Sequence, residues 1–98
     1  MSTDESDDAA LRIARFIVDD LEYGGPVTDF LGSEPVRLPE AIDSAALLEL
    51  ATFIEDDFGV QIQDEDIVPQ NFATVADVVR LLRDKGALAP PAATGDRD

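Results

Sequence analysis

Three stretches of the chain carry apolar residues at the three- and four-residue spacing of an α-helix, and none shows the two-residue alternation of a strand. The spacing predicts helices from about Asp7 to Glu22, from Ser44 to Phe58, and from the cap Thr74 to just before Gly86. A further single turn is expected from Asp64 to Val68, before Pro69. The sequence therefore predicts an all-α fold, a small bundle of three main helices plus one short helix.

The first predicted helix has one buried stripe and a clear end. The stripe consists of Leu11, Ala14, Ile17, Val18 and Leu21, widened by Ile13 and Phe16. Gly24 and Gly25 are expected to end the helix, and Pro26 prevents it from resuming. We expect this helix to be scaffold for the core.

The second predicted helix separates a core face from an exposed face. The core face comprises Leu47, Leu50, Ala51, Ile54 and Phe58, and Gly59 suits the helix end. The other side is formed by Ala45, Leu48, Glu49, Thr52, Glu55 and Asp56. In most proteins such acids only form a solvated helix surface. An exposed leucine ringed by carboxylates instead suggests a face that docks a partner protein.

A long connection separates the first two helices. From Tyr23 to Asp43 it is punctuated by glycine and proline, so little structure is expected beyond a single turn around Thr28 to Leu31. A connection of this length in a small domain needs a reason. Bridging two roughly parallel helices along their length would provide one.

The last predicted helix has a cap signal at its start and a proline-rich segment after its end. Asp77 follows Thr74 by three residues, which is a capping-box-like arrangement. The buried stripe is Val75, Val78, Val79 and Leu82, flanked by Leu81. We expect residues 1–6 to be a frayed N-terminus, residues 7–86 to form the folded domain, and residues 87–98 to be a disordered tail.

The charge of the chain limits its partners. Its 98 residues include 22 acids and 7 bases, which gives a net charge of −15, and it has no cysteine. Such a surface repels nucleic acid and anionic membranes, and it attracts proteins with basic patches. We see no signal-peptide pattern and no apolar stretch long enough to span a bilayer. We therefore expect a cytoplasmic monomer that binds neither nucleic acid nor membrane.

No self-sufficient active site can be assembled from the sequence. Asp64-Glu65-Asp66 lacks the alternating ligands, central glycine and closing glutamate of a calcium loop. Asp57-Phe58-Gly59 matches the kinase magnesium tripeptide by letters only, because the accompanying kinase motifs are missing. The chain has no histidine to activate a serine nucleophile. We expect no catalytic residue, no metal ligand and no enzyme activity.

Ser44, preceded by Asp43, opens the second predicted helix and is the residue most open to chemistry. Its hydroxyl can accept a bond from a free backbone N–H one turn in, which would make it simply the N-cap. The same position suits a covalently attached phosphate, because unpaired N–H groups and the positive end of the helix dipole meet there. The Asp-Ser pair alone favours the cap, because most serines in this setting are caps. The rest of the chain changes that balance.

The wider pattern resembles the acyl carrier protein family, which includes the peptidyl carrier domains of nonribosomal synthesis. The resemblance rests on Asp43-Ser44, Glu49-Leu50, Phe58-Gly59-Val60, Asp64-Glu65-Asp66 and Asn71-Phe72-Ala73-Thr74-Val75, and it covers roughly Leu11 to Lys85. It implies a right-handed bundle of three main helices plus a short one, with a long first loop. The periodicity and the helix breakers agree with that fold.

The resemblance also implies a function and a set of partners. Ser44 would carry 4′-phosphopantetheine through a phosphodiester, placed there from coenzyme A by a separate phosphopantetheinyl transferase, and Asp43 would help to place magnesium during that step. The thiol of the arm would hold acyl or aminoacyl groups as thioesters. The positions that match the family's recognition surface are Ala45, Leu48, Glu49, Thr52, Glu55 and Asp56. The remaining partners would be an acyl- or aminoacyl-loading enzyme and downstream synthase enzymes with basic docking patches.

Two positions depart from the family pattern. Ala41 stands where the family usually has glycine, and Ala45 stands where it usually has a large apolar residue. These departures concern the identity of partners more than attachment, and together with the Ala/Pro-rich tail they favour a specialised pathway. Because the sequence shows no second domain, we expect a free-standing carrier. Fatty-acid, polyketide and nonribosomal-peptide cargo stay open. The alternative is an unmodified acidic helical adaptor that binds a basic protein partner, with Ser44 only a cap.

Overall fold

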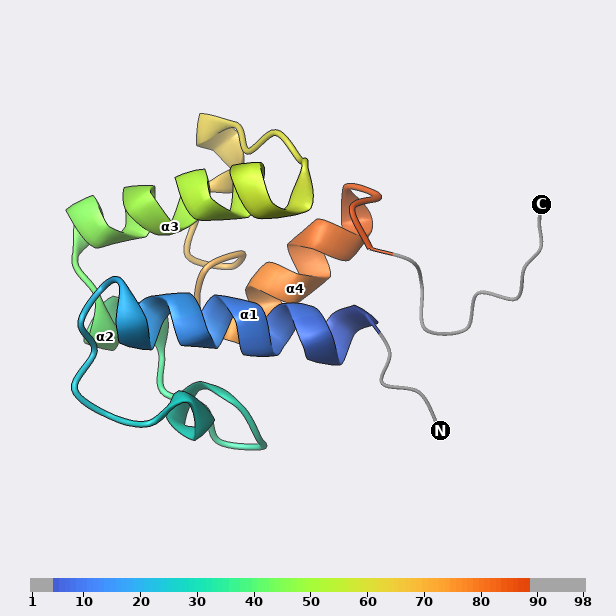
Figure 1. Ribbon diagram of the computed structural model, residues 1–98. Helices are drawn as coiled ribbons and strands as arrows, with labels where there is room; N and C mark the ends of the chain where they lie inside the picture. The colour runs from blue at the N-terminus through green and yellow to red at the C-terminus, as the bar shows by residue number, and fades with distance from the viewer. Residues whose placement is uncertain (1–4, 89–98) are drawn as a thin grey trace.

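The computed structural model describes residues 5–88, with side chains from residue 7 onward, and contains helices but no strand over that range (Figure 1). In chain order the elements are α1 (Glu5–Asp19), the 3-10 turn η1 (Val27–Phe30), α2 (Leu38–Ala41), α3 (Ser44–Phe58), the 3-10 turn η2 (Asp64–Asp66) and α4 (Val75–Asp84). The predicted all-α bundle of three main helices is confirmed. Among these helices, none has the length and apolar content needed to cross a membrane.

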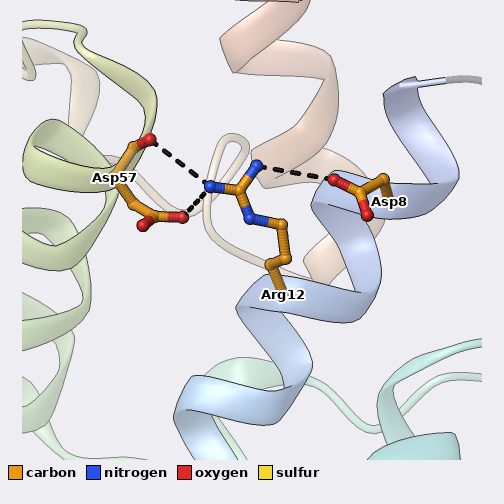
Figure 2. Close-up of polar contacts among 3 residues, drawn as sticks. All are labelled: Asp8, Arg12 and Asp57. Carbon is orange, nitrogen blue, oxygen red and sulfur yellow. Dashed lines mark hydrogen bonds and ion pairs between the residues drawn. The ribbon is translucent and has the colours of Figure 1, made fainter.

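Helices α1 and α3 lie side by side and run in opposite directions (Figure 1). Figure 2 shows Arg12 of α1 reaching Asp57 near the end of α3, and further along α1 the ring of Phe16 stacks on that of Phe53, with centroids 4.2 Å apart. The later residue of α1, Phe16, thus contacts the earlier residue of α3, Phe53, so the two helices are antiparallel. The expectation that the long connection bridges two roughly parallel helices is therefore wrong.

The long connection instead folds back against α1 before it reaches α3. Its turn η1 packs on α1, and the Tyr23 hydroxyl donates a hydrogen bond to Asp29 at 2.8 Å. The chain then returns to α2, where Pro39 occupies the first turn, a position that suits proline. The N–H of Leu38 donates to the carbonyl of Ala73 at 2.8 Å, which ties α2 to the segment that precedes α4. The sequence did not predict α2, because four residues are too few to show a helical period.

The core is formed by α1, α3 and α4 together with residues of the long connection. Its largest fully buried side chains are Phe30, Ile13, Ile17, Leu38, Leu50, Ile54, Leu82, Val75 and Val78. On α1 the buried stripe is centred on Ile13, Ala14 and Ile17, whereas Leu11 is 37% exposed. The prediction was wrong at Leu11, because several apolar residues of α1 fit the helical period equally well.

Helix α1 ends at Asp19, earlier than the predicted Glu22. Glu22 adopts a left-handed conformation with φ of 60°, and the N–H of Tyr23 bonds to the carbonyl of Ile17 at 3.3 Å. The left-handed residue turns the chain out of the helix, although glycine is the usual residue at such a position. The reversal thus occurs before Gly24 and Gly25, not at them.

Helix α4 begins as predicted and is followed by two more packed residues. The hydroxyl of Thr74 accepts a hydrogen bond from the N–H of Asp77 at 3.2 Å, which caps the helix. Beyond Gly86, Ala87 packs against the core and Leu88 is 8% exposed. The rest of the expected tail, residues 89–98, and residues 1–4 of the expected frayed end lie outside the described residues.

Candidate functional site

Ser44 is the first residue of α3, and the residue that caps the helix is Asp43. Asp43 has an extended backbone, and its Oδ1 accepts a hydrogen bond from the N–H of Ala46 at 2.9 Å. The carbonyl of Asp43 accepts the first helical bond, from the N–H of Leu47. Aspartate and serine are both favoured as N-caps, but an N-cap residue has a non-helical backbone, and here that residue is Asp43. The expectation that Ser44 itself serves as the N-cap is therefore wrong.

Because Asp43 caps α3, the Ser44 hydroxyl is not needed to complete the helix. The residue is exposed, and its hydroxyl makes no hydrogen bond to any part of residues 5–88. It stands at the positive end of a helix of 15 residues whose first turn carries no acidic side chain. An anion attached to this oxygen would meet the favourable end of the helix dipole. Asp43, one residue back, is the nearest carboxylate along the chain.

A pocket of about 280 Å³ opens directly beside Ser44. Ser44 and Asp43 contribute its polar part, and the rest of the lining is apolar, consisting of Leu38, Pro39, Ile42, Leu47 and Phe72. The walls come from α2, from the first turns of α3 and from the segment before α4. The sequence alone does not reveal this apolar lining, because Leu38 and Phe72 are brought together by α2 and by the hydrogen bond from Leu38 to Ala73.

The predicted docking face of α3 is largely exposed. Of its members, Ala45, Leu48, Glu49, Thr52 and Asp56 are exposed. Leu48 stands out, because 58% of a large apolar side chain is in contact with solvent. Ala45, Glu49, Thr52 and Asp56 recur at helical spacing, so they share one side of α3 with Leu48 beside them. The hydroxyl of Thr52 is already used, since it donates to the carbonyl of Leu48 at 3.1 Å.

Glu55 differs from the other members of this face. It is half-buried, and its Oε2 accepts a hydrogen bond from the N–H of Ile62 at 2.8 Å. This bond fastens the segment after α3 to the helix. Glu55 therefore has a structural role that the sequence did not reveal, because the acceptor and the donor are seven residues apart on either side of a glycine turn.

Several of the cations in the described chain pair with acids away from the docking face. Arg12 pairs with Asp8 and Asp57, Arg80 with Asp77, and Lys85 with Asp66. Neither Glu49 nor Asp56 makes an ion pair within residues 5–88. The exposed side of α3 therefore presents uncompensated negative charge around Leu48, which is the pattern that attracts a basic surface.

Residues 5–88 contain no group of three or more His, Cys, Asp or Glu side chains arranged to hold a metal ion. A scan against models of known protein families and a search of curated proteins find no match for this chain.

Proposed function

We propose that this chain is a carrier protein that holds 4′-phosphopantetheine on Ser44 and presents acyl or aminoacyl cargo to partner enzymes. The observation that carries the proposal is the capping of α3 by Asp43, which frees the adjacent hydroxyl. A serine that caps its own helix would have to break that bond to react. Ser44 is exposed and lacks such a bond within the described chain, so an enzyme can reach its oxygen directly.

The residues around Ser44 suit the attached group. The start of α3 favours the phosphate diester through the helix dipole, and the pocket of about 280 Å³ offers an apolar surface next to it. When bound, the group supplies a thiol for thioester formation, which a chain without cysteine does not have. During attachment, the Ser44 oxygen would form a new bond to the phosphorus that bears the pantetheine arm. The diphosphate P–O bond of coenzyme A would break, adenosine 3′,5′-bisphosphate would leave, and the serine proton would pass to a base of the transferase.

The exposed side of α3 suits the recognition of partners. Leu48 provides an apolar contact one turn from Ser44, and Glu49 and Asp56 provide negative charge around it. Proteins with basic patches are steered towards such a surface, at rates that fall as salt is added. The partners of this role are a phosphopantetheinyl transferase, a loading enzyme and downstream synthase enzymes. The small side chain of Ala45 leaves these partners to rely on Leu48 for apolar contact.

Intact-mass measurement tests the proposal. The chain is incubated with coenzyme A and a broad-specificity phosphopantetheinyl transferase and then weighed. We expect the added mass of one phosphopantetheine, lost in Ser44→Ala and kept in the matched control Ser33→Ala, which changes another exposed serine. A mass that stays unchanged with several transferases would favour the alternative, an unmodified acidic adaptor that uses the same face of α3.

A further inference from the structure

A second surface lies between α1 and α3, beside the docking face already described. It is a cleft of about 370 Å³ whose lining includes the aromatic rings of Phe16 and Phe53. The two rings are stacked, with centroids 4.2 Å apart and planes 11° from parallel, and both residues are half-buried. Aromatic surface therefore remains open to solvent in this cleft.

Some of the charged side chains around the cleft form ion pairs, and others do not. At one end, Arg12 is held by Asp57, so these two charges compensate each other (Figure 2). At the other end, the lining includes Asp19 and Asp20, which are exposed and make no ion pair within residues 5–88. Arg15 also lines the cleft without an ion pair in that range. The end near Asp19 and Asp20 therefore carries a net negative charge beside aromatic rings.

The antiparallel register continues this negative charge onto α3. Asp20 directly follows α1, and its N–H bonds to the carbonyl of Phe16 one turn earlier at 2.8 Å. Glu49 lies one turn before Phe53 on α3. Because Phe16 stacks on Phe53, the register places Asp20 and Glu49 at the same level of the two helices. The cleft is thus continuous with the exposed acidic side of α3.

Elsewhere in this protein, an arginine side chain already contacts an aromatic ring and carboxylates at the same time. The guanidinium of Arg12 stands 4.5 Å from the centroid of the Phe58 ring while it binds the carboxylates of Asp8 and Asp57. Arginine combines these two contacts well, because its planar group stacks on aromatic rings and donates several hydrogen bonds to carboxylates. Lysine has a compact charge that does not stack in the same way.

We propose that the cleft between α1 and α3 receives an arginine side chain of a partner protein, with the solvent-exposed part of the stacked Phe16–Phe53 pair contacting its guanidinium and Asp19 and Asp20 binding its N–H groups. The interaction surface of this chain then extends from α3 onto the second half of α1. This inference goes beyond the carrier role, because it does not depend on modification of Ser44.

Nuclear magnetic resonance titration of the unmodified full chain tests the inference. The probe is the blocked peptide Ala-Arg-Ala-Ala-Arg-Ala, compared with the same peptide carrying lysine or glutamine in place of arginine. We expect the arginine peptide to shift the amide signals of Phe16, Asp19, Asp20 and Phe53 first. The lysine peptide is expected to bind about twofold to threefold more weakly, and the glutamine peptide not measurably.

A pair of charge-matched variants gives the decisive comparison. Asp19→Asn/Asp20→Asn removes two carboxylates from the cleft, and Asp64→Asn/Glu65→Gln removes two exposed carboxylates from η2. The first should weaken binding of the arginine peptide about threefold to tenfold, and the second less than about twofold. Equal losses in both variants, shifts centred on another surface, or equal binding of the lysine and arginine peptides would overturn the proposal.

Discussion

The Asp43 carboxylate accepts a hydrogen bond from the N–H of Ala46 at 2.9 Å. Because of this bond, Asp43 and the adjacent Ser44 have different roles. Asp43 completes the start of α3, while Ser44 keeps an exposed and unused hydroxyl. The proposed attachment of a phosphate-linked group depends on this division. Stability and reactivity at the site should therefore respond to different substitutions.

Asp43→Ala should destabilise the fold by about 1 kcal/mol, because it removes the side-chain cap of α3. Asp43→Asn keeps an oxygen at the same place and should lose much less. If the carboxylate also takes part in the transferase reaction, Asp43→Asn should be modified slowly although it is folded. Urea unfolding and the rate of modification measure the two effects separately, and equal stability of the alanine and asparagine variants would argue against the cap.

Ser44→Ala should change the free energy of unfolding by less than about 0.5 kcal/mol, because the hydroxyl makes no bond within the described chain. If Ser44 were the cap, the same substitution would cost about 1 kcal/mol. The comparison uses the unmodified protein, and Thr74→Ala is the matched control, because Thr74 does cap its helix. A loss in Ser44→Ala as large as that in Thr74→Ala would contradict the assignment of Asp43 as cap.

Glu49 and Glu55 should respond differently to charge reversal. Glu49→Lys leaves the fold intact, because its side chain is exposed and makes no ion pair within residues 5–88, and it should slow transfer by partner enzymes about threefold to tenfold at low salt. Glu55→Lys removes the acceptor of the Ile62 N–H and should destabilise the protein as well. Transfer kinetics and thermal unfolding distinguish the two, and unaltered transfer by the Glu49 variant at low salt would discredit the docking face.

The ion pair between Asp66 and Lys85 should make stability depend on acid pH. The Lys85 ammonium lies 2.7 Å from the Asp66 carboxylate, and together with the Gln63 N–H it holds the pKa of Asp66 below its ordinary value of 3.8. The folded state therefore favours the charged form, and the resulting stabilisation is present above pH 3.8 and fades as the pH falls through the lowered pKa. Asp66→Asn should be less stable than the wild type at pH 7.

Urea unfolding at a series of pH values checks this linkage. The difference between wild type and Asp66→Asn should shrink as the solution is acidified below pH 3.8. Asp64→Asn, which changes an exposed neighbour on the same turn, is the control and should show little difference at any pH. A difference between wild type and Asp66→Asn that stays constant with pH would show that the pair does not couple protonation to folding.

The sequence predicted α3 well because each of its ends carries a local signal. Asp43-Ser44 marks the start, and Gly59 takes up a left-handed conformation with φ of 65° at the end. The buried face between them follows a regular period, with Leu50 and Ile54 fully buried. Local signals of this kind do not require any knowledge of the rest of the fold.

Other features depend on contacts between distant residues, and the sequence did not reveal them. Helix α2 and the pocket beside Ser44 depend on the bond from Leu38 to Ala73, which joins the long connection to the segment before α4. The antiparallel pairing of α1 and α3 depends on Phe16 meeting Phe53. At the start of α3, two adjacent residues were both suitable caps, and only the backbone conformation of Asp43 decides between them.

The most direct test of the carrier role is to locate the modification on the chain. After reaction with coenzyme A and a phosphopantetheinyl transferase, the protein is digested and fragmented in a mass spectrometer. The proposed function predicts one phosphopantetheine, found on Ser44 and on no other residue. An unmodified Ser44, or the group on another residue such as Ser33, would contradict it.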